Sequence, residues 1–528
     1  MTMSPLHATP LPLLWALTGC ADPPPQPSEP LRFVRDGVVA PAGETGNPLP
    51  DGTHFVPRTW SPGEQVTVHG QTATAPHRAE CVPLFSVPLG DVSRLVSAGG
   101  GAPNTAMAFS PGGDLLAVGS HRGEVLVVDG WSGEILARKR LAETMVKAVA
   151  WSHDGQTLYA AEQSPDAFLH ALRVEDLNTR WSLRLADVVG SSAPPPDEDI
   201  YGVYKLPAAY GLLVLPSDDV VVTALHSWAD ETGQHRNQSQ LLRIRPDGQI
   251  ASRWPAEPVE ATLKHPRLDD RGELLLVSVN HSSSLPPPPD LPVGGVVALR
   301  LDDLTPITEA TPSPLQPWFS ESFVWEALDI SAEHGIFIGL GDGRVLTYDL
   351  SGAPSLEAST GAPIMAGDVP IHASVGFGGF HEGGLLYTTS TTLIPYGASS
   401  SALRPPSAHP AENTLWYARP DNTVVWSWTG SQILSGLTHS PDGRFLVVGA
   451  GDRDADTRRD LYGALIFDLQ DPMNSRSGEQ RLQTFCPTQG PVFFRQAASV
   501  DGRIALAEYP YQDEDGSIEG SYQVTVMR

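Results

Sequence analysis

Short apolar segments recur along the chain in pairs, each pair separated by a short polar turn. The segments are rich in Val, Leu, Phe and Ala, a composition typical of short strands. Gly or Asp at the tip of each turn suits the positive φ that tight hairpins often need. The pattern therefore predicts eight hairpins, whose tips are Gly113, Gly155, Asp218-Asp219, Gly272, Gly335, Gly384, Gly443 and Gly502.

Two more strand-like segments follow each of the first seven hairpins, and no helical period of any length interrupts them. Four antiparallel strands per unit, repeated around an axis, are typical of a β-propeller. The eighth unit stops at Arg528 with its fourth strand missing, while an extra strand-like segment lies at 80–89. Using that segment to complete the last unit removes two exposed sheet edges. We therefore predict an all-β, eight-bladed propeller closed by an N-terminal strand, with seven blades as the alternative.

The repeat is longer than the roughly 40–45 residues of a compact propeller unit. Proline-rich inserts account for much of the excess, and such segments are expected to form surface loops because proline cannot join a strand ladder. These inserts are at 191–199, 284–292, 311–317 and 403–410. The predicted domains are a signal peptide at 1–20, a Pro-rich tether with a small β extension at 21–79, and the propeller at 80–528. In the extension, FVPRTW and EQVTVHG flank a Ser61-Pro62-Gly63 turn and predict a hairpin.

The N-terminus carries a short apolar stretch that ends in Leu17-Thr18-Gly19-Cys20 and is followed by a proline-rich segment. An apolar run with small residues before a cleavage point is typical of a secretory signal. The four-residue ending resembles the bacterial lipobox, which implies that Cys20 is acylated and becomes the mature N-terminus. Pro23–Pro30 would then be a stiff tether above a membrane. The alternative is an N-terminal tail with an incidental cysteine.

Cys81 and Cys486 are the other two cysteines. An even pair in an exported protein is a candidate disulfide. Cys81 begins the strand expected to close the ring, and Cys486 precedes the expected inner strand of the last blade. We therefore predict a disulfide that locks the ring closure, with two buried thiols as the alternative.

Composition narrows the range of functions. The chain has 61 acidic and 34 basic side chains and a net charge of −27, which argues against nucleic-acid binding because phosphate would be repelled. An apolar fraction of 41 % is enough for a packed core and excludes wholesale disorder. The 50 Gly and 50 Pro show no three-residue period, which excludes collagen.

Two families share features with the repeats. Ser110-Pro111-Gly112-Gly113, Ser152-His153-Asp154-Gly155 and Ser440-Pro441-Asp442-Gly443 resemble the turns of WD40 or YVTN-type repeats. Strands ending in Trp resemble quinoprotein-type eight-bladed propellers, in which such a Trp docks on the next blade; here they end in Trp181, Trp254, Trp426 and Trp428. Both resemblances imply a propeller, and we expect these four Trp to pack between blades.

Candidate chemistry is sparse. The sequence lacks a G-x-S-x-G elbow, an H-E-x-x-H helix and a G-x-x-x-x-G-K-[ST] loop, so no catalytic or cofactor-binding residue is predicted. Several scattered histidines fall near the predicted inner strands or their loops, where a channel could collect them, with surface or turn positions as the alternative. The histidines are His226, His265, His281, His372, His381 and His439. Alternating carboxylates at Asp452, Asp454 and Asp456 form a candidate Ca²⁺ loop, as do Asp513, Asp515 and Glu519. A solvated charged loop is the alternative, and no other cofactor is expected.

These observations predict a lipoprotein of the bacterial cell envelope, anchored through Cys20 to the outer membrane or cell surface. A propeller offers loops on a stiff scaffold, which suits protein docking, so we expect other envelope proteins as partners. An outer-membrane assembly lipoprotein is the nearest analogue by fold. The alternative is an enzyme acting at the central channel, either a quinone-dependent dehydrogenase or a hydrolase, lyase or sulfotransferase.

Overall fold

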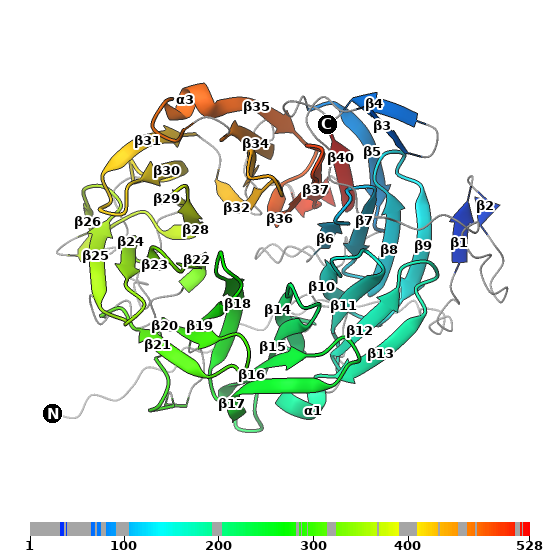
Figure 1. The fold of residues 1–528 in the computed structure, drawn as a ribbon, viewed down its shortest axis with the longest axis horizontal. Helices are drawn as coiled ribbons and strands as arrows, with labels where there is room; N and C mark the ends of the chain where they lie inside the picture. Colours follow the sequence, from blue (N-terminus) through cyan, green and yellow to red (C-terminus); the bar gives the residue numbers. More distant parts are fainter. Residues whose placement is uncertain are drawn as a thin grey trace, which may run out of the picture.

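Eight four-stranded antiparallel sheets surround a central axis in the computed structural model (Figure 1). The structure describes residues 32–35, 38–39, 65–68, 71–74, 81–90, 105–192, 203–280, 285–286, 288–292, 294–313, 324–366, 369–389, 409–430, 433–451, 462–469, 472–512, 518–519 and 521–528. Each sheet is one blade, with its first strand nearest the axis. The predicted eight-bladed propeller is confirmed, and the seven-bladed alternative is wrong.

The inner strands are β6 (Ala106–Phe109), β10 (Met145–Trp151), β14 (Ala208–Val214), β18 (Thr262–Leu268), β22 (Val324–Ser331), β28 (Val375–His381), β32 (Leu434–His439) and β36 (Val492–Ala498). Each contacts the next around the ring, and β36 contacts β6. The second strands are β7 (Leu115–Gly119), β11 (Thr157–Gln163), β15 (Val220–Ala229), β19 (Leu274–Asn280), β23 (Gly335–Leu340), β29 (Gly384–Thr389), β33 (Phe445–Ala450) and β37 (Ile504–Glu508).

The third strands are β8 (Glu124–Asp129), β12 (Phe168–Arg173), β16 (His235–Ile244), β20 (Gly295–Arg300), β24 (Arg344–Tyr348), β30 (Thr414–Ala418), β34 (Gly463–Asp468) and β40 (Gln523–Met527). The outer strands are β9 (Ile135–Arg140), β13 (Thr179–Arg184), β17 (Ile250–Val259), β21 (Pro306–Ala310), β25 (Pro354–Ser359), β31 (Val424–Thr429), β35 (Leu482–Pro487) and β5 (Pro83–Pro88). Two short helices, α1 (Ala186–Val189) and α3 (Gly478–Arg481), lie in connections.

The hydrophobic core lies between neighbouring blades. One cluster joins Leu116 and Val118 of the first blade to Val524 and Val526 of the eighth, and other clusters likewise span adjacent blades. Second strands such as β7 are buried along their whole length because they have a blade on either side, whereas the outer strand β25 is mostly exposed. Burial of apolar surface between blades therefore stabilises the ring.

The hairpin tips follow the prediction with one shift. Gly113, Gly155, Gly272, Gly335, Gly443, Gly502 and Asp218 all have positive φ. In the sixth hairpin the turn residues are Glu382 and Gly383, at φ 44° and 74°, and Gly384 instead pairs with His381 at the start of β29. A two-residue turn with positive φ at both positions needs its glycine one residue earlier than we predicted.

The N-terminal strand β5 closes the ring by pairing with β40 of the eighth blade. Backbone hydrogen bonds between Val82 and Arg528 extend this pairing at 2.9 and 3.0 Å. The prediction of a closing strand at 80–89 is thus confirmed.

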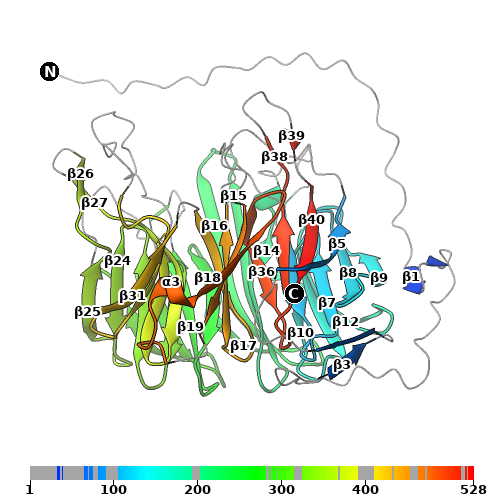
Figure 2. The same cartoon turned by 90° about the horizontal axis from the view of Figure 1, so that it is seen from above.

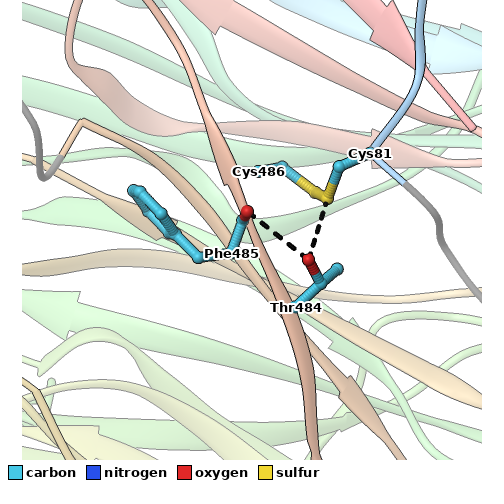
Figure 3. The surroundings of a disulfide bond; sticks show 4 residues. All are labelled: Cys81, Thr484, Phe485 and Cys486. Carbon is cyan, nitrogen blue, oxygen red and sulfur yellow. Dashed lines mark hydrogen bonds between the residues drawn. A yellow bond between two sulfur atoms is a disulfide. The ribbon is translucent and has the colours of Figure 1, made fainter.

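A disulfide joins Cys81 to Cys486, with the two Cα atoms 5.1 Å apart (Figure 3). The Thr484 hydroxyl lies 3.5 Å from Cys81 Sγ. Cys486 lies on β35, the outer strand of the seventh blade, and packs in one apolar cluster with Val492 of β36, the inner strand of the eighth. The bond therefore links the seventh blade to the segment that leads into the closing strand of the eighth.

The four tryptophans pack between consecutive blades, as expected. The indole N–H of Trp181 donates to the Pro246 carbonyl of the next blade at 2.7 Å. Trp254 joins an apolar cluster with the fourth blade, and Trp426 and Trp428 join one with the seventh.

Two small hairpins precede the ring. Strands β1 (Arg32–Arg35) and β2 (Val38–Val39) pair, and β1 adds to the outer edge of β9. Strands β3 (Gln65–Val68) and β4 (Gln71–Thr74) form the second hairpin, so the EQVTVHG segment pairs with the residues after it. The FVPRTW segment lies outside the described residues. Among the described residues, no helix combines the length and apolar character that a membrane span needs.

The two faces of the ring differ in their connections. All inner strands begin at one face, which also receives the connections between second and third strands and those between blades. Each of the four proline-rich inserts falls in such a connection, so we name this side the insertion face. The additional hairpins β26–β27 (Ile364–Ala366, Val369–Ile371) and β38–β39 (Tyr511–Gln512, Ile518–Glu519) project from it (Figure 2). The opposite side, the turn face, carries mostly short turns.

Candidate functional site

Seven of the eight inner strands carry a register shift near their beginning, where more residues fit on the inner strand than on its partner. In the described pairing of β6 with β7 no such shift occurs. The shifts lie between 146 and 148, 209 and 211, 264 and 267, 324 and 328, 375 and 377, 434 and 437, and 492 and 496. Such bulges redirect side chains and are frequent beside functional sites.

Charged side chains from these bulges meet on the ring axis. Glu326 of the fifth blade approaches Arg495 of the eighth at 3.9 Å. These blades are not neighbours, so the contact crosses the centre of the ring. Glu326 also approaches His265 at 3.8 Å and Arg267 at 3.7 Å, both from the fourth blade. With Lys147 of the second blade and Lys264 of the fourth, we name these residues the axial cluster.

Two tyrosines orient the lysines. Lys147 Nζ lies 4.8 Å from the ring centre of Tyr204 and 4.7 Å from that of Tyr210. Lys264 Nζ lies 5.0 Å from the same Tyr210 ring, on the third blade between them. An ammonium group over an aromatic face is attracted by the ring quadrupole. The tyrosines therefore hold two like charges close to each other.

The protonation of the cluster reflects its enclosure. Burial, together with the charges of Arg495 and Lys264, lowers the pKa of Lys147 from 10.5 to about 7. Burial lowers the pKa of Lys264 to about 8 and that of His265 to about 3. For Glu326, burial alone would raise the pKa, but Arg495 and the other nearby positive charges outweigh it and keep the pKa below its usual value. Glu326 is thus ionised, and His265 is neutral, at pH 7.

Solvent reaches the cluster although it lies inside the ring. Side-chain exposure is 39 % for Arg495, 38 % for Arg267 and 24 % for Glu326. With both lysines protonated, the cluster carries four positive charges against the single carboxylate of Glu326. The whole chain has a net charge of −27 and only four lysines, two of which lie here. A local excess of positive charge is therefore the main chemical feature of this site.

The aromatic surroundings continue toward the insertion face. Tyr204 lies in the connection before β14 and meets His121 of the first blade edge to face at 6.4 Å. Tyr509 and Tyr522 of the eighth blade stack at 6.0 Å, and the Tyr522 hydroxyl accepts a hydrogen bond from the His121 backbone at 2.9 Å. Tyrosines from these blades thus enclose the axial cluster on the insertion-face side.

A pair of neutral groups lies at the turn face, between the sixth and seventh blades. His381 and His439, at the ends of β28 and β32, stack at 5.3 Å. Burial lowers the pKa of His439 from 6.5 to about 4 and also lowers that of His381. Both imidazoles are therefore neutral at pH 7.

Most residues predicted as sites lie elsewhere. Cys20, His281, the loop of Asp452, Asp454 and Asp456, and Asp513 and Asp515 fall outside the described residues, and the side chain of Glu519 is likewise not described. His226 contacts Ser192 and His372 lies beside His409. Within the described part of the chain, no three His, Cys, Asp or Glu side chains gather in a group able to hold a metal ion.

Sequence inspection singled out only His265 of the axial cluster. The sequence did not predict the other members of the cluster, among them Lys147, Lys264, Glu326 and Arg495. These residues belong to different blades, and only the closed ring brings them together. One signal was available: two of only four lysines, Lys147 and Lys264, fall in the segments predicted as inner strands, where an apolar residue would be expected.

Comparisons with known proteins place the chain in no family. No protein-family model matches the sequence, and no curated protein matches it. Among solved structures, the C-terminal WD40 domain of Sif2 has a TM-score of 0.49 at 11 % identity, covering 85 % of this chain and 98 % of its own. BamB from Moraxella catarrhalis has a TM-score of 0.47 at 13 % identity, covering 85 % and 99 %. The dihydro-heme d1 dehydrogenase NirN in complex with DHE has a TM-score of 0.42 at 15 % identity, covering 70 % of this chain and 64 % of its own, so this chain spans less than two thirds of NirN.

Proposed function

We propose that the protein is a binding scaffold of the bacterial cell envelope, held at a membrane by a lipid on Cys20. The observation that carries this proposal is the unequal distribution of connections over a closed ring. The strand ends joined by the longest connections lie at the insertion face, and the hairpins β26–β27 and β38–β39 project from it, while the turn face carries mostly short turns. Binding residues concentrate on loops that a rigid scaffold positions. The insertion face is accordingly the expected contact surface for another envelope protein.

Two features support the rigidity and the location. The closing strand β5 and the Cys81–Cys486 disulfide hold the last two blades together, which keeps the loops of the insertion face in fixed relative positions. Disulfides persist in oxidising compartments such as the periplasm and the cell surface, so this bond agrees with export. The lipobox-like ending at Cys20 supports attachment by lipid.

Crosslinking tests the scaffold role. Cells that express the full chain are crosslinked, the membranes are extracted with mild detergent, and the protein is captured. We expect one partner to be enriched over a lipid-anchored control protein of similar abundance. Replacing Met365, exposed on the β26–β27 hairpin of the insertion face, by Ser should reduce that enrichment, whereas replacing the exposed turn-face residues Asp302 and Asp303 by Ser should not. Equal capture by the control protein would contradict the scaffold role.

Mass spectrometry of the mature N-terminus tests the anchor separately. We expect an N-terminal peptide that begins at Cys20 and carries acyl chains, and a Cys20→Ser variant that stays in the soluble fraction. A mature chain that begins at Met1 without acylation would contradict the lipid anchor and leave the scaffold role to be judged by the crosslinking result.

A further inference from the structure

We propose that the axial cluster binds a free small oxyanion with two negative charges, such as a dicarboxylate, phosphate or sulfate. The site is independent of the protein-binding role proposed above. It consists of Lys147, Lys264, Arg267 and Arg495, with Glu326 and the Tyr210 ring between them. These groups come from the second, third, fourth, fifth and eighth blades, so only the closed ring creates the site.

The contacts of Glu326 are too long to satisfy the cations around it. Its oxygens lie 3.7 Å from Arg267 and 3.9 Å from Arg495. A charge-assisted hydrogen bond between such groups is about 2.7–2.9 Å long. The guanidinium groups therefore retain donors for an additional acceptor, which an oxyanion of fixed shape can supply.

The charge balance gives the valence of the ligand. When both lysines are protonated, the described residues of the cluster have three more positive than negative charges, and Asp329, whose carboxyl also interacts with Arg267, reduces that excess. Like charges held close together inside the ring repel each other, and an opposite charge placed among them removes this cost. A monoanion would leave most of the excess unbalanced, whereas a dianion comes close to neutralising it. This balance favours a dicarboxylate, phosphate or sulfate over acetate or chloride.

The enclosure sets the size of the ligand. Side chains meet across the axis at Glu326 and Arg495, so little room remains at that level. The cations are nevertheless 38–39 % exposed at both arginines, which shows that water reaches them. A ligand of a few atoms can replace that water, while a folded polypeptide or a nucleic acid cannot reach the axis. We therefore assign the site to a free small ion.

Binding should take up protons. Lys147 has a pKa of about 7 and Lys264 of about 8, so both are partly neutral in slightly alkaline solution. Lys147 faces Lys264, Arg495, Glu326 and the rings of Tyr204 and Tyr210. A bound anion raises the pKa of both lysines, and linkage then requires affinity to fall as pH rises. Raising the pH from 6.5 to 8.5 should weaken binding about tenfold or more.

Isothermal titration calorimetry of the full chain in detergent tests the site. Malonate and sulfate are the probes, because both keep two negative charges above pH 6.5, and phosphate is a third arm. We expect saturable binding of one dianion per chain, weak or no binding of acetate, and proton uptake measured by comparing buffers of different ionisation enthalpy. Stronger binding of malonate than of sulfate would identify a dicarboxylate site, and the reverse a tetrahedral oxyanion site.

Charge-removing variants locate the binding. Lys147→Gln and Lys264→Gln should each weaken malonate binding about tenfold. Lys205→Gln is the matched control, because it removes the same charge from an exposed side chain next to Tyr204 and should leave affinity unchanged. Glu326→Gln should strengthen binding, since it removes the carboxylate that lies between Arg267 and Arg495. Near-ultraviolet circular dichroism verifies that each variant is folded, and Arg495→Gln replaces any variant that is not.

Three outcomes would overturn the proposal. The first is the absence of saturable binding by every dianion at pH 6.5. The second is binding that Lys147→Gln and Lys264→Gln leave unchanged, which would place the anion elsewhere. The third is affinity that does not change with pH although binding occurs, because the lysines would then take no part.

Discussion

Arg503 and Arg495 belong to the same blade, eight residues apart, yet their surroundings are opposite. Arg503 is fully buried on the turn face, where it pairs with the equally buried Asp501 at 2.8 Å. Its remaining donors reach the Gly113 and Gly130 carbonyls of the first blade, and its guanidinium lies 4.1 Å from the ring centre of Trp131. Asp501 thus holds the guanidinium in place, and the other contacts of the guanidinium connect the last blade to the first.

Arg495, in contrast, is 39 % exposed on the axis, and its nearest carboxylate lies 3.9 Å away on the fifth blade. Its neighbours Lys147 and Lys264 have the same charge. A matched, buried ion pair is expected at a structural contact between blades. An excess of one charge is expected where a ligand of opposite charge binds. Structural contacts and ligand binding are therefore separated in this ring. The Arg503–Asp501 pair at the turn face stabilises the contact between the last and first blades, whereas the axial cluster near the insertion face retains an excess of positive charge.

The largest effect should come from breaking the matched pair. Arg503→Met leaves Asp501 buried without its counterion and removes the bonds to the first blade. We expect the free energy of unfolding to fall by about 3–5 kcal/mol, the usual cost of breaking a buried pair. Denaturant unfolding followed by tryptophan fluorescence measures this. Arg495→Met, the matched variant on the axis, should cost less than about 1 kcal/mol. Similar losses of unfolding free energy in Arg503→Met and Arg495→Met would show that the two arginines contribute equally to stability, which would contradict the contrast.

Removing the disulfide should have the next largest effect. Cys81 and Cys486 close a loop with a sequence separation of 405, so the bond restricts the unfolded chain strongly. Replacing both cysteines by Ser should lower stability by about 2–5 kcal/mol. The oxidised wild-type protein treated with reductant should unfold at the same denaturant concentration as the double variant. If the reductant has no effect on a protein that mass spectrometry shows to be reduced, the bond does not stabilise the closure.

The sequence predicted the structural contacts of the ring better than it predicted the axial cluster. The strand order, the closing strand and the interblade Trp181 were predictable because local alternation and turn residues determine them. Gly384 was misplaced by one residue because the sequence HEGG offers two adjacent glycines for one turn. The axial cluster was not predictable, because Lys147 and Arg495 are 348 positions apart in the sequence. Their side chains come close to each other only because the bulges in β10 and β36 turn them toward the axis.

Replacing Lys147 should change the free energy of unfolding less than Arg503→Met or loss of the disulfide does, and should raise it instead of lowering it. Its folded-state pKa of about 7 lies below the unfolded value of 10.5, so the folded chain binds fewer protons between these values. Stability should then rise with pH from 7 toward 10.5, and the penalty is fully present below pH 7. Lys147→Met removes the penalty and should stabilise the protein by about 1–2 kcal/mol at pH 6.5, less at pH 10.

Lys205→Met is the control for this gain, because the exposed Lys205 should leave stability almost unchanged at either pH. Stability is measured by denaturant unfolding without any dianion present. A residue that lowers stability at physiological pH is expected to persist only for function, which is the trade-off that binding sites commonly show. A loss of stability in Lys147→Met at pH 6.5 would mean that the lysine supports the fold instead.

The smallest effect on stability is expected at the histidine pair on the turn face, between the sixth and seventh blades. His439 has a folded-state pKa of about 4, below its ordinary 6.5, because it is buried against His381. The folded form keeps the ring neutral, so stability is lost as pH falls from 6.5 toward 4. His439→Gln should reduce that loss by about 1–2 kcal/mol, as each unit of pKa difference corresponds to about 1.4 kcal/mol. Unfolding curves at pH 6.5 and 4.5 measure the difference. Malonate affinity at pH 6.5 should not change in this variant, because the neutral histidine pair contributes no charge to the axial cluster. A changed affinity would show that the histidine pair and the axial cluster are energetically coupled.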